Sequence, residues 1–245
     1  MKAAVLIQAR SRSTRLPGKC FLPMPFMISL SVVERVYSQV ARSGIQCYFV
    51  IPDDDEDLRR HLFEKKLPFL TGPEHDVRER YRKAATALHL DVIVRATADN
   101  PFTDPDHIVL SLNRMKEAGV ELFSFTDLPL GVAVEVFTMQ ALMTDTPGER
   151  DIHREHVSLH IKHHPERFAV LHEPSPVMMS WRRRTQYGGP LPRLTVDEWR
   201  DYDTLVAVAE RLEEDSLIGL LDLFLSMPDL FEGNRDVEQL RFDRG

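Results

Sequence analysis

The chain has 245 residues, of which 43% are hydrophobic and 28% are charged, as in ordinary soluble globular proteins. Its formal net charge of −7 argues against a general nucleic-acid-binding surface, and no apolar run approaches the length of a membrane span. Two cysteines, Cys20 and Cys47, are too few for a disulfide framework, and the apolar run before Gln8 is too short for a signal peptide. We therefore expect a cytoplasmic protein with no membrane or nucleic-acid partner.

The first half of the chain alternates between strand and helix patterns. Short apolar runs predict strands over residues 3–7, 45–51, 68–70, 91–96 and 120–123. Helical spacing and capping residues predict helices over 31–42, 56–66, 76–88 and 104–118. This alternation is typical of an α/β domain in which helices cover both faces of a mainly parallel sheet.

The second half is less regular. Residues 130–137 are rich in valine and alternate loosely, and 169–172 read as extended. We expect helices over 153–164, 205–212 and 217–225, and a loop over 178–192 with two glycines and several arginines. Residues 231–245 form a polar tail, which we expect on the surface or partly disordered.

The loop from Gln8 to Cys20 carries four cations, at Arg10, Arg12, Arg15 and Lys19, separated by small or turn-forming residues. It follows a buried strand, and open α/β sheets bind ligands beyond the carboxyl ends of their strands. Cations and accessible backbone N–H groups favour a polyphosphate. A solvated basic loop remains the alternative from charge alone.

Two familiar phosphate-binding loops are excluded. A P-loop needs glycine five residues before Gly18 and serine or threonine after Lys19, but Ser13 and Cys20 occupy those positions. The dinucleotide fingerprint needs three glycines in six residues, and this loop has one. The loop therefore indicates another class of nucleotide site.

Two carboxylates could face this loop. Asp99 follows the strand predicted over 91–96, and Asp197 ends an apolar segment. A carboxylate near a triphosphate is favourable if Mg²⁺ lies between them, since Mg²⁺ is typically held by one or two carboxylates and phosphate oxygens. The alternatives are a turn residue before Pro101 for Asp99 and an N-cap of the helix from Trp199 for Asp197.

Other polar clusters have simpler explanations. The acids at 53–55 could hold a metal but favour the start of the following helix. His156 and His160 have the spacing of a zinc pair, but the glutamate that zincins place after the first histidine is missing. The run 181–184, Trp-Arg-Arg-Arg, could bind an acidic ligand, but an exposed loop is the simpler interpretation.

Five motifs occur in an order that resembles one known family. They are Gln-Ala-Arg-Ser-Arg-Ser-Thr-Arg-Leu-Pro-Gly-Lys over 8–19, Arg-Ala-Thr-Ala-Asp-Asn-Pro-Phe-Thr-Asp-Pro over 95–105, Gly-Val-Ala-Val-Glu-Val-Phe over 131–137, Arg-Glu-His-Val over 154–157 and Arg-Leu-Thr-Val-Asp over 193–197. Together they resemble the SpsF-like family of spore-coat polysaccharide biosynthesis proteins. That family is related to the cytidylyltransferases that make CMP-activated acidic sugars.

The resemblance implies one GT-A-like nucleotidyltransferase domain over residues 1–230 that binds CTP and Mg²⁺. Its catalytic residues would be Arg10, Lys19 and Asp99, and its metal ligands Asp99 and Asp197. Its nucleotide-binding residues would be Ala9, Arg10, Ser13, Arg15, Lys19, Asp76, Arg80 and Thr97.

The resemblance also places the acceptor and dimerisation part within about 130–192. Glu135, Arg154 and His156 would face the sugar, and the protein would form a homodimer. The chain departs from its relatives at three places. Residues 24–27 lack the usual Gly-Lys-Pro turn, Ala-Asp-Asn-Pro replaces Gly-Asp-Cys-Pro over 98–101, and Ala133 replaces an aspartate.

The function implied is a cytidylyltransferase that activates an acidic or modified sugar for cell-surface polysaccharide or glycan synthesis. Two alternatives stay open. One is a nucleotidyltransferase of similar fold that uses another nucleotide or a non-sugar acceptor. The other is a degenerate member that binds nucleotide or sugar as a regulatory subunit.

Overall fold

A computed structural model describes residues 1–26 and 28–239. Met27, which belongs to the altered stretch 24–27, lies outside the described residues. So does the part of the expected tail from 240 to 245. In the described part of the chain, no helix is long and apolar enough to cross a membrane.

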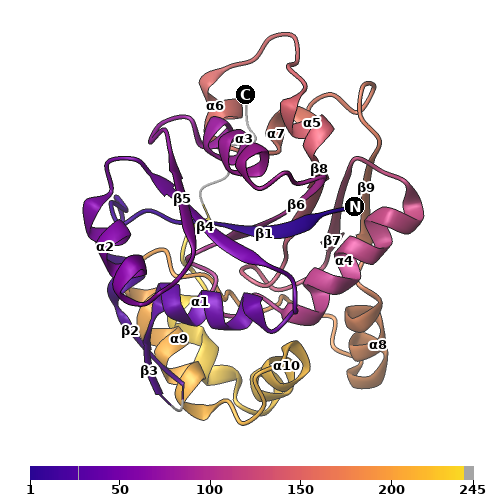
Figure 1. Cartoon of the computed structure of the whole chain (residues 1–245). Helices are drawn as coiled ribbons and strands as arrows, with labels where there is room; N and C mark the ends of the chain where they lie inside the picture. Colours follow the sequence, from indigo (N-terminus) through magenta and orange to yellow (C-terminus); the bar gives the residue numbers. More distant parts are fainter. Residues whose placement is uncertain (27, 240–245) are drawn as a thin grey trace.

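A central sheet organises the described residues, and its strand order is β5-β4-β1-β6-β8-β7-β9 (Figure 1). These strands are β1 (Ala3–Gln8), β4 (Cys47–Pro52), β5 (Phe69–Gly72), β6 (Val92–Thr97), β7 (Leu122–Thr126), β8 (Glu135–Thr138) and β9 (Val170–Pro174). In this sheet β8 runs antiparallel to both of its neighbours, and the other pairs are parallel. A separate hairpin consists of β2 (Pro23–Phe26) and β3 (Ile28–Ser31). The mainly parallel α/β sheet predicted from the sequence is confirmed.

The two central strands place the polar loops. β1 and β6 are mostly apolar and buried because helices cover both faces of the sheet, and polar residues appear toward their carboxyl ends. They pair in parallel from Ala3 opposite Val92 to Gln8 opposite Thr97. The loops that follow these strands therefore leave the sheet side by side.

Helices pack in three groups around the sheet. Their bounds are α1 (Val32–Ala41), α2 (Glu56–Glu64), α3 (Val77–Ala87), α4 (Pro105–Ala118), α5 (Met139–Met143), α6 (Asp151–Glu155), α7 (Leu159–Lys162), α8 (Pro176–Thr185), α9 (Trp199–Arg211) and α10 (Leu217–Ser226). One apolar core joins α1, α2 and α4 to one face of the sheet, and a second joins α3, α5 and α7 to the other. A third core holds α8, α9 and α10 together, with α9 and α10 beyond α1 in Figure 1.

Aspartates start several of these helices. The Asp55 side chain accepts a hydrogen bond from the backbone N–H of Leu58 at the start of α2, and Asp76 accepts one from Glu79 at the start of α3. The capping interpretation of the acids at 53–55 is therefore confirmed for Asp55.

The helix predicted over 153–164 is wrong in its continuity. The chain forms two short helices, α6 and α7, and His156 lies between them with extended backbone angles. His160 is fully buried, and its Nε2 lies 3.0 Å from the carbonyl oxygen of Ala141. The hypothesis of a zinc pair therefore loses its basis, because His156 and His160 do not lie on one helix.

The loop predicted over 178–192 is also wrong in its first part. Ser175 caps α8 and Pro176 occupies its first position, a start signal just upstream of the expected loop. Trp181 is 1% exposed and packs in the third core. The arginines that follow it belong to the last turn of a helix.

The C-terminal segment up to residue 239 is part of the folded domain. A 3₁₀ helix covers Pro228–Asn234, and Phe231, Asn234 and Val237 are buried. The other described residues of the tail are exposed, so the expected surface location holds for most of it, and these three side chains attach it to the domain.

A buried polar chain links three helices. Nδ1 of His107 on α4 lies 2.7 Å from Oδ2 of Asp104, and Nε2 lies 2.8 Å from Oγ of Ser175, the cap of α8. Asp104 also accepts from the backbone N–H of Leu217 on α10. The three side chains are each at most 5% exposed, so this Ser-His-Asp arrangement is structural.

Replacing this histidine tests that role. His107→Leu should lower the free energy of unfolding by about 3 kcal/mol, because it leaves buried polar groups without their partner. Urea denaturation measures the change, and Asn113→Ala, on the exposed side of the same helix, should stay within about 0.5 kcal/mol of the wild type. Equal stability of the His107 variant and the wild type would contradict the structural role.

Candidate active site

The first loop after β1 is held in place by Asp55. Its carboxylate accepts from the Ser11 backbone N–H and from Ser11 Oγ, both at 2.7 Å, while it also caps α2. At the end of the turn, the Gly18 N–H donates to the Ser11 carbonyl at 2.9 Å. Gly18 has φ of +71°, a left-handed conformation that favours glycine. The role of Asp55 in this loop was not predicted, since the sequence shows only its place before a helix.

Lys19 is the residue on which the predicted site converges. Its ammonium lies 2.9 Å from Oδ2 of Asp99 and 3.4 Å from Oδ1 of Asp197. It also donates to the backbone carbonyl of Val196 at 2.6 Å. The Lys19 side chain is only 12% exposed, so these contacts form in a partly desolvated place. The structure thus brings together three residues that are far apart in the sequence.

Backbone contacts explain why residues 193–197 lie at this edge of the sheet. The Val196 N–H donates to the Asp99 carbonyl, and the Leu194 N–H donates to the Leu130 carbonyl, both at 2.8 Å. Gly131 has φ of +97°, and a Cβ there would lie 2.4 Å from the Leu194 carbonyl oxygen. Only glycine therefore allows this close approach.

Asp197 is surrounded by cations. Besides Lys19, its Oδ1 lies 2.9 Å from Arg15 Nη2, and its Oδ2 lies 2.6 Å from Arg193 Nη2. The cap of α9 is Glu198, so the alternative of Asp197 as an N-cap is not what the structure shows. Arg193 also pairs with buried Asp201 at 2.7 Å. It belongs to the motif over 193–197, but its contact with Asp197 was not predicted.

Asp99 belongs to the turn that follows β6, and its side chain also pairs with Lys19. Burial raises the pKa of this carboxyl, but the Lys19 ammonium and the Thr97 hydroxyl outweigh burial, and the pKa is lowered overall. Thr97 Oγ1 in addition accepts from the Asn100 side chain at 2.8 Å. Asp99 is therefore ionised at neutral pH and able to hold a cation.

The remaining cations of the first loop do not join this cluster. Arg12 donates to Asp54 at 2.6 Å and lies 3.7 Å from Glu74, on the exposed side of the loop. Arg10 is exposed and has no hydrogen bond or ion pair within the described residues. Burial lowers the pKa of Arg80, and the charge of Arg10 lowers it further. Arg10 is thus a cation at this edge that no carboxylate of the described chain neutralises.

The other predicted nucleotide-binding residues shape the edge of the site. Arg80 is buried and donates to the carbonyls of Pro73 and Glu74 at 2.8 Å, so its guanidinium supports the loop before α3. Ala9 is buried at the end of β1, and its N–H donates to Val50. Ser13 Oγ accepts from the Leu16 N–H at 3.4 Å within the first loop.

Glu135, predicted to face the acceptor sugar, lies in a separate network. Its carboxylate accepts from Arg95 at 3.2 Å, from Ser158 at 2.7 Å and from Lys162. Arg95 also reaches Gln8 Oε1 at 3.4 Å, which connects this network to the end of β1. Arg95 and Lys162 were not predicted, because their distance in the sequence from Glu135 gives no signal.

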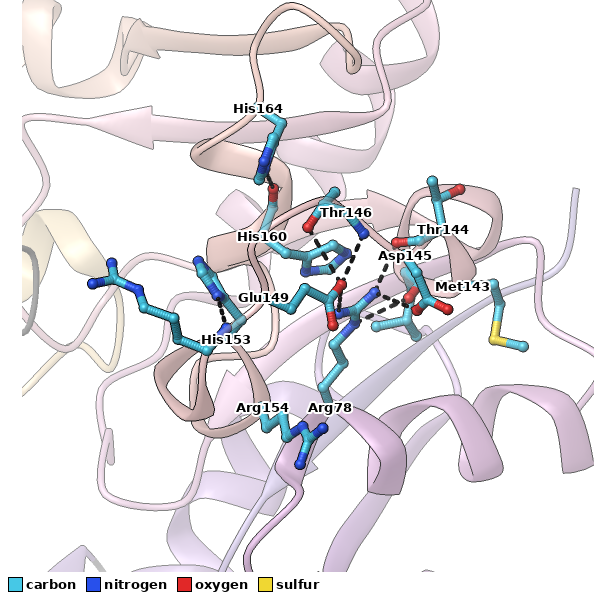
Figure 2. A network of polar contacts seen from close by, with 12 residues as sticks. Arg78, Met143, Thr144, Asp145, Thr146, Glu149, His153, Arg154, His160 and His164 are labelled. Carbon is cyan, nitrogen blue, oxygen red and sulfur yellow. Dashed lines mark hydrogen bonds and ion pairs between the residues drawn. The ribbon is translucent and has the colours of Figure 1, made fainter.

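The predicted acceptor segment is fixed to α3 by Arg78 (Figure 2). This fully buried arginine pairs with Glu149 at 2.7 Å and donates to the Thr144 carbonyl at 2.7 Å. Arg154 follows on α6, and its Nε lies 4.0 Å from Asp76, the cap of α3. Asp76 and Arg154 therefore lie close together where α3 and α6 meet. Glu135 lies in the separate network described above.

The donor set suits a hard divalent cation. Within the described residues, no group of three or more histidine, cysteine, aspartate or glutamate side chains converges. Oxygens of Asp99 and Asp197 both lie within 3.4 Å of the Lys19 ammonium, so both carboxylates face the position of one cation. Carboxylate oxygens are ligands that Mg²⁺ typically takes together with phosphate oxygens.

Comparison with known proteins gives the family. Residues 4–243 match the family model described as cytidylyltransferase. The chain belongs to this cytidylyltransferase family. It is therefore a nucleotidyltransferase by family, and the expected resemblance to SpsF-like proteins is confirmed.

Individual relatives agree with this family. The chain is 29% identical over 216 residues to the spore coat polysaccharide biosynthesis protein SpsF of Bacillus subtilis, with 85% of this chain and 87% of that protein covered. A cytidylyltransferase structure from Leptospira borgpetersenii has a TM-score of 0.81 at 24% identity and covers 98% of this chain and 99% of that one. A CMP:2-keto-3-deoxy-manno-octonic acid synthetase complexed with CTP has a TM-score of 0.57 at 13% identity, over 76% of this chain and 98% of that one. These structures share the fold.

The Glu135 network gives a pH-dependent prediction for this cytidylyltransferase. Burial raises the pKa of Glu135, but Lys162 and Arg95 lower it more, from an ordinary 4.5 to about 2. A carboxylate whose pKa is lower in the folded than in the unfolded protein stabilises the fold fully at pH values above its unfolded pKa. This stabilisation is lost as the pH falls through its folded pKa. A fall of this size corresponds to about 3 kcal/mol.

We therefore expect the difference in unfolding free energy between wild type and Glu135→Gln to shrink by about 3 kcal/mol between pH 4.5 and pH 2. Urea denaturation at a series of pH values measures it. If the two proteins lose stability in parallel over this window, the carboxylate does not have the lowered pKa.

Proposed function

We propose that this cytidylyltransferase transfers CMP from CTP to a hydroxyl group of an acidic or modified sugar and releases pyrophosphate. The convergence of Lys19 on Asp99 and Asp197 carries the proposal. This cluster lies where β1 and β6 end in register, the place at which open α/β sheets bind their ligands. The relatives support the substrate classes, since one is named for polysaccharide biosynthesis and one was solved with CTP.

The charge balance of the cluster favours a metal-bound triphosphate. The cluster contains three cations, on Arg15, Lys19 and Arg193, and three carboxylates, on Asp99, Asp197 and Asp201. Each of these groups contacts at least one group of opposite charge. A triphosphate added to this balanced set brings uncompensated negative charge. Arg10, which has no ion-pair partner in the described part of the chain, offsets only part of it. A divalent cation supplies the remainder.

Asp99 and Asp197 would hold the Mg²⁺ ion, and Lys19 would then be released from them to contact phosphate oxygens. When bound, Mg²⁺ neutralises phosphate charge and lowers the pKa of an attacking hydroxyl. Arg10 and Arg15 would bind phosphate oxygens, because arginine can contact two oxygens at once and keeps its charge.

The reaction itself is one displacement. The sugar hydroxyl oxygen forms a bond to the α-phosphorus of CTP as the bond to the bridging oxygen breaks, the pyrophosphate leaves and the hydroxyl proton passes to solvent. Glu135 is a poor candidate for a general base, because it accepts from three donors and its pKa is lowered to about 2. The work of the protein is therefore positioning and charge neutralisation.

Removing the first carboxylate tests this proposal. Asp99→Ala should abolish Mg²⁺-dependent pyrophosphate release with CTP and a panel of sugar acids while the fold is kept. Lys19→Ala should lower the rate by about 10²–10³, as for loss of a preorganised donor. A coupled pyrophosphate assay measures both, and Asp106→Asn, on the exposed face of α4, is the matched control.

Three outcomes would contradict the proposal. Near wild-type turnover of Asp99→Ala would rule out its role as a metal ligand. Thermal stabilisation of the wild type by another nucleoside triphosphate with Mg²⁺, but not by CTP, would favour a different nucleotide. If no nucleoside triphosphate raises the melting temperature, the chain is not a nucleotide-binding member of the family.

A further inference from the structure

The two arginines that hold Asp197 are themselves contacted by the C-terminal segment, residues 234–239. Arg193 Nη1 donates to the side-chain oxygen of Gln239 at 2.6 Å. Arg15 Nη1 donates to the backbone carbonyl of Glu238 at 3.5 Å. Glu238 and Gln239, which follow Asp197 by more than forty positions, therefore lie beside the cluster proposed to bind the metal.

The C-terminal segment is fixed to the rest of the domain just before these contacts. Asn234 is fully buried, and its Nδ2 donates to the Arg193 carbonyl at 3.1 Å and to Asp201 at 3.0 Å. The preceding Gly233 packs so closely that a Cβ there would lie 2.4 Å from Thr204 Oγ1. Val237, two residues before Gln239, is buried, and its N–H donates to the Asn234 carbonyl at 3.1 Å, so the attachment continues close to Gln239.

Arg193 depends on hydrogen bonds for its orientation. It contributes to the wall of a cavity of about 540 Å³ that also contains Tyr187 and Phe224, so side-chain packing does not enclose it on every side. Its guanidinium donates to Asp197, to Asp201 and to Gln239. Each acceptor constrains the plane of the guanidinium, and the guanidinium in turn holds Oδ2 of Asp197.

We propose that Gln239 is a positioning residue of the active site, which acts through Arg193 on the orientation of Asp197. The inference rests on the proposed role of Asp197 as a metal ligand. Partners bonded directly to a metal-binding side chain, as Arg193 is to Asp197, change metal affinity by about 10–100-fold when they are lost, and Gln239 acts on that partner, so we expect an effect at the lower end of this range. In this case the partner belongs to a polar C-terminal segment that carries none of the family motifs found in the sequence.

The test compares metal binding in full-length variants. Gln239→Ala removes the acceptor, Gln239→Glu keeps an oxygen that can pair with Arg193, and Glu238→Ala changes the neighbouring exposed side chain but keeps the carbonyl that Arg15 contacts. Titration with Mn²⁺ in the presence of CTP, followed by the electron paramagnetic resonance signal of free Mn²⁺ and compared with CTP alone, gives the affinity of the protein without turnover. The Mg²⁺ concentration for half-maximal pyrophosphate release gives a second readout.

We expect Gln239→Ala to weaken Mn²⁺ binding and raise the Mg²⁺ requirement by about 10-fold. Its melting temperature should stay within about 2 °C of the wild type, because Gln239 is exposed and lost surface contacts change stability little. Gln239→Glu and Glu238→Ala should behave as the wild type does.

Unchanged Mn²⁺ affinity in Gln239→Ala, with normal binding by the wild type, would overturn the inference and leave the proposed function intact. Equal losses of Mn²⁺ affinity in Gln239→Ala and Gln239→Glu would also overturn the inference, because the side-chain oxygen would then not be the group that orients Arg193. If the wild type binds no Mn²⁺ with CTP, the metal role of Asp197 fails first and the inference fails with it.

Discussion

The contact of one ammonium with two carboxylates is the interaction on which this site depends. Lys19 joins the loop after β1 to the turn after β6 and to the segment 193–197, which come from three distant parts of the chain. Ionised groups in a partly buried place are costly unless each has a partner. Here Arg15 and Arg193 complete the pairing of Asp197. Each charge of the cluster therefore has a partner without ligand. In the proposed function, the cations would pair with the triphosphate and the carboxylates with its metal ion.

The sheet supplies the geometry for this contact. Because β1 and β6 end in register, the loops that carry Lys19 and Asp99 begin side by side. Gly131 then lets residues 193–197 approach the same edge, and the Val196 N–H bonds to the Asp99 carbonyl. Buried apolar strands thus fix the backbone, and short polar loops at their carboxyl ends provide the chemistry. Asp55 couples the first loop to α2 through one carboxylate.

Many of the helices and strands could be predicted from the sequence, and the predictions that were wrong failed for physical reasons. The short apolar strands and capped helices of the first half are local patterns, and the structure shows them close to their predicted places. The second half was less accurate. The continuous helix over 153–164 is broken at His156, and the arginine-rich run was mistaken for a loop although Ser175 and Pro176 start a helix. Composition there outweighed the capping signal.

The sequence alone determined the class of fold, the family and the loop that carries the cations, because these follow from apolar periodicity and from motifs that are contiguous in the chain. The tertiary structure decided which cations face carboxylates. It directs Arg12 to Asp54, leaves Arg10 exposed, and uses Arg80 for a loop. It also showed that Gln239 lies on Arg193. Contacts between residues far apart in the sequence leave no local pattern, so only the packing of the folded chain could reveal them.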